Sequence, residues 1–146
     1  MEKLPPYALS LPSNGRSLAV ARAFVEAVCH ACQLDGGTAR AVVLATGEAV
    51  SNILRHAHRH FPEATVQIHC WPGPDWLEVQ FLDEGEPFDL EAVPDLDPTE
   101  LRLGGRGVYL MRSLMDELSC EPRGERGNRL RMVKRWSSCG SVRECG

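Results

Sequence analysis

The spacing of apolar residues changes once along this chain, and this change limits the possible folds more than any other feature. Between residues 16 and 58, apolar side chains recur every three or four positions, which predicts two helices separated by Asp35-Gly36-Gly37. Between residues 66 and 81 they alternate with polar side chains in two runs joined by Pro72-Gly73-Pro74-Asp75, which predicts a hairpin of two strands. Strands that follow helices as hairpins imply a mainly antiparallel sheet with helices on one face.

Shorter elements complete the predicted order on both sides of this centre. They are a strand over residues 7–11, a helix over 16–34, a second helix capped by Thr38 and running to about residue 58, an acidic loop over 83–103 with one short helical turn, a third helix over 104–117, and a hairpin of strands at 118–122 and 130–134. We therefore predict an α+β fold, a two-layer sandwich whose mainly antiparallel sheet is covered on one face by about three helices. The domain would span residues 1–136, and residues 137–146 would form a flexible tail.

Length and charge narrow the possible functions. The chain has 146 residues, enough for one domain, and its net charge of -4 argues against nucleic-acid binding, because such domains are usually basic. Its apolar runs fall short of the ~18 residues that a membrane helix requires. The first six residues lack the basic start and apolar stretch of a signal peptide. We therefore expect a soluble, cytoplasmic protein with no membrane or nucleic-acid partner.

Six cysteines raise the question of a metal or disulfide site. Cys29 and Cys32 form a C-x-x-C motif, but they lie inside a helical pattern, and the sequence has no second such motif at zinc-finger spacing. A zinc or redox site of the H-x-x-x-C-x-x-C type would have a histidine four residues before the first cysteine, where this chain has Val25. We interpret Cys29, Cys32, Cys70 and Cys120 as reduced packing residues.

A line of polar residues in the second predicted helix could carry chemistry. Glu48, Asn52 and His56 are spaced by four residues and therefore stack on one helix face. A carboxylate and an amide one turn apart can serve a proton and a magnesium ion together, since magnesium prefers oxygen ligands and shares them with substrate phosphates. A solvent-facing polar stripe would show the same spacing, so the pattern alone leaves both interpretations open.

Two loop segments add further candidates. The run Asp83-Glu84-Gly85-Glu86-Pro87-Phe88-Asp89 follows a predicted strand, where a carboxylate could accept a hydrogen bond from an exocyclic amine; an ordinary acidic turn is the alternative. The run Leu103-Gly104-Gly105-Arg106-Gly107-Val108 precedes the third predicted helix, where exposed N–H groups suit an anion and Arg106 could contact phosphate. Helices also commonly begin after flexible glycine loops that bind nothing.

Taken together, the order and spacing of these three segments resemble the N, G1 and G2 boxes of the GHKL ATPases, which share the Bergerat ATP-binding fold. Within that superfamily the chain is most similar to the anti-sigma-factor serine/threonine kinases. The run E-A-V-S-N-x-x-x-H of residues 48–56 and the run G-R-G-V-Y-L-M-R-S-L-M-D-E-L of residues 105–118 carry this resemblance. Residues 127–134 resemble the final glycine-containing strand, so the likeness covers essentially residues 5–135.

The resemblance implies a role for each matching residue. Asn52 would hold Mg²⁺ against the phosphates of ATP, and Glu48 would be the catalytic general base or would orient the attacking hydroxyl. Asp83 would bind the adenine amine, with Gly85 giving the base access to the backbone. Gly105 and Gly107 would let a lid, residues 89–103, close around the phosphates. The residues expected to bind the cofactor are Asn52, Asp83, Gly85, Pro87, Phe88, Gly104, Gly105, Arg106, Gly107 and Val108.

Three positions depart from the family pattern. Pro87 stands where the G1 box has a second glycine, which stiffens the turn. Asn128 stands where a threonine often follows the last glycine, which leaves one hydrogen bond on the adenine side open. The residues just ahead of the G2 glycines are not basic, so the resemblance does not settle whether Arg102 or Arg106 neutralises the γ-phosphate.

The resemblance therefore implies an ATP- and Mg²⁺-dependent protein serine/threonine kinase of the partner-switching type. Such a kinase would bind a sigma factor or another regulated target, and it would phosphorylate an antagonist with a STAS-like domain. A homodimer is also implied by the resemblance, with the apolar first strand and first helix as candidate surfaces. The alternative is a non-catalytic switch of the same fold, which binds ATP and exchanges protein partners without transferring phosphate.

Overall fold

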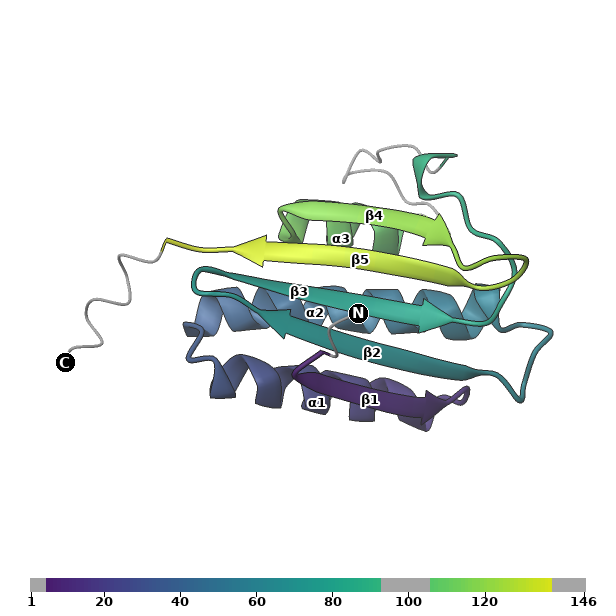
Figure 1. Ribbon diagram of the computed structural model, residues 1–146, viewed down its shortest axis with the longest axis horizontal. Coiled ribbons are helices and arrows are strands. Elements are labelled where there is room, and N and C mark those ends of the chain that lie inside the picture. Colours follow the sequence, from purple (N-terminus) through teal and green to yellow (C-terminus); the bar gives the residue numbers. More distant parts are fainter. Residues whose placement is uncertain (1–4, 93–105, 138–146) are drawn as a thin grey trace.

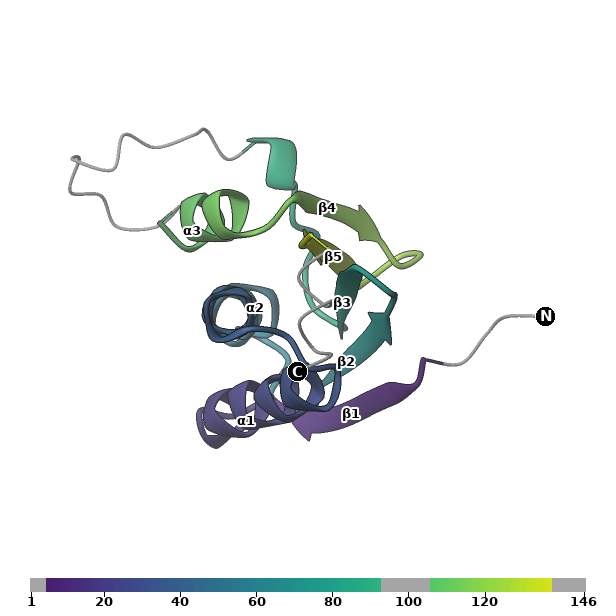
Figure 2. The same cartoon turned by 90° about the vertical axis from the view of Figure 1, so that its left-hand side faces the viewer.

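The computed structural model describes residues 5–92 and 106–137 of the chain. Within these residues, three α-helices pack against one face of a five-stranded antiparallel sheet (Figures 1 and 2). In chain order the elements are β1 (Tyr7–Pro12), α1 (Arg16–Ala31), α2 (Gly36–Asn52), the π-helical turn η1 (Ile53–Ala57), β2 (Thr65–Pro72), β3 (Trp76–Asp83), the 3-10 turn η2 (Leu90–Ala92), α3 (Arg106–Leu114), β4 (Glu117–Pro122) and β5 (Asn128–Arg135). The predicted α+β sandwich is confirmed.

The sheet has the strand order β1-β2-β3-β5-β4, and every neighbouring pair is antiparallel. The alternation predicted for the central hairpin is confirmed. Its inner side chains are fully buried under the helices, and they are Val66, Ile68, Cys70, Leu77, Val79 and Phe81. The register of β3 with β5 places Asp83 opposite Asn128, at the end of the sheet where the helical layer carries its polar residues.

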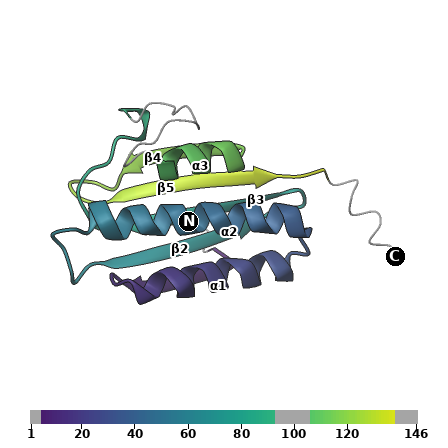
Figure 3. The same ribbon diagram turned by 180° about the vertical axis from the view of Figure 1, so that it is seen from behind.

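The helices lie side by side, with α2 between α1 and α3 (Figure 3). The helix α1 ends at Ala31, before the predicted residue 34, and Gln33 adopts a φ of 61° just beyond it. The predicted cap Thr38 is wrong. The Asp35 carboxylate caps α2 instead, because it accepts hydrogen bonds from the Thr38 N–H at 2.9 Å and the Thr38 hydroxyl at 2.7 Å.

The second helix also ends differently from its prediction. Its α-helical part stops at Asn52, and the chain widens into η1, where the His58 N–H donates to the Ile53 carbonyl oxygen at 2.8 Å. Single π-helical turns inside α-helices are frequent at functional sites. Here the turn begins at the residue directly after Asn52.

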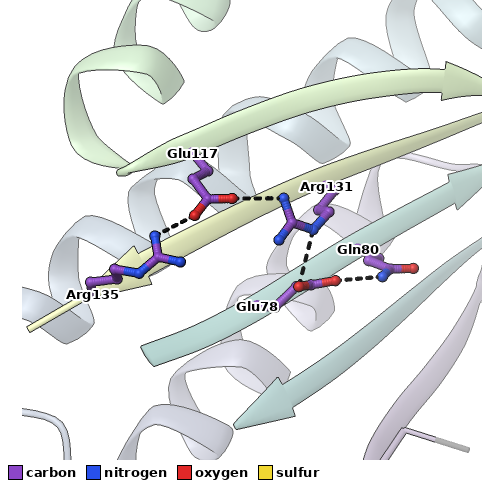
Figure 4. A network of polar contacts seen from close by, with 5 residues as sticks. All are labelled: Glu78, Gln80, Glu117, Arg131 and Arg135. Carbon is purple, nitrogen blue, oxygen red and sulfur yellow. Dashed lines mark hydrogen bonds and ion pairs between the residues drawn. The ribbon is translucent and has the colours of Figure 1, made fainter. Parts of the chain in front are cut away.

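The face of the sheet without helices is covered by charged side chains (Figure 4). Arg131 pairs with Glu78 at 3.0 Å and with Glu117 at 2.9 Å, and Arg135 also pairs with Glu117. Val133 lies in register between Glu78 and Glu117 and is only 2% exposed. Long arginine side chains can cover apolar surface with their aliphatic parts, so this network closes a face that no helix in the described residues protects.

The last predicted helix is shorter than expected, whereas the strands of the final hairpin are longer than the predicted 118–122 and 130–134. The third helix spans Arg106–Leu114, and Glu117 already belongs to β4. The short helical turn predicted in the acidic loop corresponds to η2. Most of the predicted lid and the predicted tail beyond residue 137 lie outside the described residues. Among the helices that the structure describes, none is long and apolar enough to cross a membrane.

Candidate active site

A pocket of about 300 Å³ lies between the C-terminal end of α2 and the ends of β3 and β5. Polar lining residues include Asn52 and His56 from α2 and η1, Asp83 from β3, and Asn128 from β5. Pro87, Phe88, Met111 and Leu130 add apolar walls. A concave site with a mostly apolar lining and a few convergent polar groups is typical of small-molecule binding.

The polar line predicted on α2 meets the start of α3 beside this pocket. A Cβ atom placed on Gly107 would lie 2.8 Å from Oε1 of Glu48 and 3.6 Å from Oδ1 of Asn52. Because Gly107 has no side chain, open space remains next to these two oxygen atoms. Glu48 and Asn52 are half-buried, so both remain accessible from solvent.

Asp83 lies at the other end of the pocket and is held by Asn128. Asp83 is buried, with 4% of its surface exposed. Its Oδ1 accepts hydrogen bonds from the Gly85 N–H at 2.8 Å, the Asn128 N–H at 3.2 Å and Asn128 Nδ2 at 3.1 Å. Its Oδ2 accepts only a longer contact from Asn128 Nδ2, at 3.3 Å. Because Asp83 lines the pocket, Oδ2 retains capacity to accept a hydrogen bond from a ligand.

Gly85 lies next to the pocket and packs against the π-helical turn. A Cβ atom on Gly85 would overlap the carbonyl oxygen of Ala57, which accepts a hydrogen bond from the Glu86 N–H at 3.0 Å. Gly85 itself is buried and does not line the pocket. The helix end and the loop after β3 are thus joined backbone to backbone at this point.

The turn between β4 and β5 holds the same loop from the other side. The Gly127 N–H donates to the Gly85 carbonyl oxygen at 2.8 Å, Arg123 Nη1 donates to the Asp83 carbonyl oxygen at 2.7 Å, and Arg126 Nε donates to the Glu84 carbonyl oxygen at 2.6 Å. Gly127 has a φ of +99°, which disfavours any other residue there. These hydrogen bonds hold the end of β3, with Asp83, and the loop that follows it in position.

His58 is a further buried residue of the site. Its Nε2 accepts a hydrogen bond from the Glu84 N–H at 3.0 Å, so its Nδ1 carries the proton and donates to the Ser13 hydroxyl at 3.0 Å. Burial lowers the pKa of His58 from its ordinary value, although the nearby Asp83 and Glu84 carboxylates oppose this effect. The neutral ring thus connects the end of β1 to the loop after β3.

The structure brings together most of the residues predicted for the site. Asn52, Asp83, Pro87 and Phe88 line one pocket, Glu48 and Gly107 meet beside it, and Gly85 and Val108 are buried next to it. Gly104 and Gly105 lie outside the described residues, as does the side chain of Arg106. The sequence prediction missed His58, and also Arg59 and His60 on the pocket lining. Their run His56-Ala57-His58-Arg59-His60 was the available signal.

The cysteines contribute packing to the described part of the molecule. Cys29 and Cys70 are buried, and burial raises the pKa of their thiols to about 11 and about 12. Burial also raises the pKa of the Cys120 thiol to about 11, although this side chain borders the pocket. The described residues contain no group of three or more His, Cys, Asp or Glu side chains that could hold a metal ion.

Comparison with known proteins shows which family the chain resembles. The histidine kinase-like ATPase domain model matches residues 11–134. The serine-protein kinase RsbW of Oceanobacillus iheyensis is 26% identical over 118 residues, which is 75% of each chain. RsbW of Bacillus subtilis is 37% identical over 83 residues, which is 51% of this chain and 52% of that protein.

Solved structures show the same fold. A chain of the SiaB-SiaC complex from Pseudomonas aeruginosa matches with a TM-score of 0.65 at 20% identity, covering 88% of this chain and 89% of that chain. A histidine kinase domain from the blue-light activated histidine kinase of Erythrobacter litoralis matches with a TM-score of 0.52 at 23% identity, covering 85% of this chain and 61% of that one. With a family model spanning nearly its whole described length, the chain belongs to the histidine kinase-like ATPase domain family, and its relatives include the RsbW serine-protein kinases.

Proposed function

We propose that this protein is an ATP- and Mg²⁺-dependent protein serine/threonine kinase that phosphorylates a STAS-like antagonist in a partner-switching module. The observation that carries the proposal is the meeting of Glu48 and Asn52 at Gly107, beside a pocket whose far end holds Asp83. This arrangement places a hydrogen-bond acceptor for the base at one end of the pocket. Beside the other end it places an oxygen ligand for a metal ion and a carboxylate that can accept a hydroxyl proton. Family membership supports the use of ATP.

The donor set fits a nucleotide with its magnesium ion. Oδ1 of Asn52 is a neutral oxygen donor at the pocket edge, and magnesium usually takes one or two protein oxygens and completes its shell with phosphates and water. The ion would neutralise phosphate charge when bound. At the other end, Oδ2 of Asp83 would accept a hydrogen bond from the exocyclic amine of adenine. Pro87 and Phe88 would contact the apolar faces of the base.

Glu48 is the residue we assign to the phosphoryl-transfer step. Its Oε1 faces the start of α3, one helical turn from Asn52, and its half-buried side chain can reach a hydroxyl brought in from outside. There it would accept the serine proton, or orient the hydroxyl, as the oxygen attacks the terminal phosphate. Phosphoryl transfer depends mostly on positioning and charge stabilisation, so one such carboxylate is sufficient.

The partners follow from the same proposal. The kinase would bind a sigma factor or another regulated target in the cytoplasm, where its buried thiols Cys29 and Cys70 stay reduced. A homodimer would form through β1 and α1. Tyr7 on this edge strand is 37% exposed and Val20 on α1 is 47% exposed, which leaves apolar surface for a second copy.

Phosphate transfer to purified STAS-domain proteins from the source organism tests the proposal. We expect phosphoserine or phosphothreonine on one of them with Mg-ATP, and loss of the signal in Glu48→Gln and Asn52→Ala. Glu26→Gln is the matched control, because Glu26 is exposed on α1 away from the pocket. In the same samples, ATP at ~100 times its dissociation constant should stabilise the folded protein by about 2.7 kcal/mol. Absence of both transfer and stabilisation would overturn the proposal.

One observation favours the alternative, a non-catalytic switch that binds ATP and exchanges partners. Leu103 and Gly104 stand just ahead of the G2 glycines, where the family often has a basic residue, so no side chain at these two positions can neutralise the γ-phosphate. Stabilisation by ATP and ATP-dependent partner binding, without phosphate transfer to any STAS-domain protein, would identify the switch.

A further inference from the structure

We infer that neutral His58 is a positioning residue for the loop after β3, residues 84–88, and that protonation of His58 in mild acid releases this loop and weakens nucleotide binding. The inference rests on the proposed nucleotide site and adds a pH-dependent control to it. It is carried by the contacts of one buried side chain that has no part in the proposed phosphoryl-transfer step.

The hydrogen bonds of His58 require a neutral ring with its proton on Nδ1. The Glu84 backbone N–H can only donate, and it lies 3.0 Å from Nε2, so Nε2 must carry a lone pair. Nδ1 then donates to the Ser13 hydroxyl at 3.0 Å. His58 is 3% exposed, so water has little access to either contact. A proton on Nε2 would set two N–H groups against each other and break the contact with Glu84.

The ring is held at a fixed place, and it can therefore restrain the loop. The His58 N–H donates to the Ile53 carbonyl oxygen at 2.8 Å, and the His58 carbonyl oxygen accepts from the Phe61 N–H at 2.9 Å. Through Nδ1 the same residue contacts Ser13, which lies between β1 and α1. One imidazole thus ties the loop after β3 both to the π-helical turn and to the segment that joins β1 to α1.

The restrained loop forms part of the pocket wall. Glu84 is soon followed by Glu86, Pro87 and Phe88, which line the pocket. Arg126 also holds Glu84, through its carbonyl oxygen, but a guanidinium group keeps its charge throughout the physiological pH range. An imidazole changes its charge between about pH 5 and 8. The contact with His58 is therefore one that mild acid can remove.

Charged groups face His58 from the loop and from the β4–β5 turn, and they act in opposite directions. Burial has the largest effect and lowers the pKa of His58, the Asp83 and Glu84 carboxylates raise it, and Arg126 lowers it. From the β1–α1 segment the facing group is the uncharged Ser13 hydroxyl. The net pKa lies below the ordinary value of 6.5, so the ring is neutral at neutral pH and takes up a proton as the pH falls further.

Nucleotide binding and protonation of His58 should therefore oppose each other. If the nucleotide binds to the protein with the loop held by neutral His58, a proton on Nε2 weakens nucleotide binding. By the reciprocity of linked equilibria, the bound nucleotide must then lower the pKa of His58 by the same free energy. Both effects are measurable, and a histidine that only fills space would show neither.

Dissociation constants of Mg-ATP, measured by calorimetry at about pH 7.5 and about pH 5.5, test the first effect on the wild type and on His58→Gln. Glutamine is the matched variant, because its side-chain oxygen can accept from the Glu84 N–H in place of Nε2 and does not titrate. We expect similar affinities at the higher pH. At the lower pH the wild type should bind about tenfold more weakly than His58→Gln, since one linked proton changes affinity by up to about tenfold per pH unit. His30→Gln, at an exposed histidine of α1, should keep the wild-type pH dependence.

An NMR titration of the His58 ring in the wild type tests the second effect. We expect a lower pKa with Mg-ATP bound than without it. If His58→Gln does not fold or does not bind Mg-ATP at about pH 7.5, this titration decides the inference without the variant. Circular dichroism at each pH identifies the range in which the compared proteins are folded.

The outcomes separate the inference from the proposed function. A wild type that does not bind Mg-ATP at about pH 7.5 would overturn the nucleotide site and the inference together. A wild type that binds Mg-ATP with the same pH dependence as His58→Gln would overturn the inference alone, as would a His58 pKa that the nucleotide leaves unchanged.

Discussion

Replacing Gly85 by alanine should destabilise the protein more than its small size suggests. A Cβ atom there would overlap the Ala57 carbonyl oxygen and lie 2.7 Å from the Ala57 Cβ, and the close neighbour is backbone that no rotamer change can move. Inserting a methyl group into a packed site costs about 1–3 kcal/mol. The displaced loop would also lose the Glu86 N–H to Ala57 hydrogen bond, worth about 0.5–1.5 kcal/mol. Together these terms give about 2–4 kcal/mol.

Thermal unfolding followed by circular dichroism measures this effect. For a domain of this size, 2–4 kcal/mol corresponds to a Tm lower by roughly 6–12 °C. Gly15→Ala is the matched control, because Gly15 has no atom within 4 Å of a built Cβ and an ordinary helical φ of -62°. Its Tm should stay within about 2 °C of the wild type.

A Gly85→Ala protein that unfolds within about 2 °C of Gly15→Ala would refute this reasoning. The loop after β3 would then be able to move away from the π-helical turn without cost. In that case the hydrogen bonds from Gly127 and the two arginines of the β4–β5 turn would not fix the loop, and the position of Asp83 would have to be set by the ligand.

Three further predictions follow from neighbouring contacts. Gly107→Ala should leave the Tm unchanged or raise it slightly, because alanine favours a helix more than glycine does. It should lower the phosphorylation rate, because the added Cβ would displace the Glu48 carboxylate; thermal unfolding and phosphotransfer assays on the same protein check the two effects. Acid should destabilise the protein through His58, because the pKa of this residue is lower in the folded than in the unfolded state. The contribution of His58 to the free energy of unfolding is complete above the unfolded pKa of about 6.5 and is lost as pH falls through the folded pKa. Urea unfolding at a series of pH values should therefore show a weaker pH dependence of stability in His58→Asn than in the wild type. Leu44→Asp should reduce kcat/KM for the protein substrate at least about tenfold while the dissociation constant of ATP is unchanged, because Leu44 is 52% exposed one helical turn before Glu48; an equal loss of ATP affinity would contradict this.

The sheet and its helices could be predicted because each signal is local. Alternating apolar residues in β2 and β3 and the turn between them are sufficient to specify a hairpin. The helix cap was less certain, since Asp35 and Thr38 are both good capping residues and only the observed hydrogen bonds decide between them. The prediction of an α+β fold was therefore correct although the predicted N-cap of α2 was wrong.

The details of the site depend on contacts between distant segments and could not be predicted in the same way. The π-helical turn after Asn52 changes the apolar spacing over only five residues, too few to distinguish it from an α-helix. His58 lies in a run of histidines that resembles an exposed polar segment, yet Ser13 and Glu84 enclose it. Asn128 reaches Asp83 across 45 residues of sequence, so its partner is visible only in the folded sheet.

The two faces of strand β5 have different roles. The strand should therefore tolerate substitutions on its outer face but not the deletion of a residue. Asn128, Leu130 and Met132 point to the pocket and core, whereas Arg131 and Arg135 point to the ion-paired face in Figure 4. Substitutions on the outer face can accumulate without reaching the pocket. A deletion of one residue would exchange the two faces, so guanidinium groups would enter the hydrophobic interior while Leu130 and Met132 turned to water. This strand therefore tolerates substitutions at outward-facing positions such as Arg129, but it does not tolerate a change in the number of its residues.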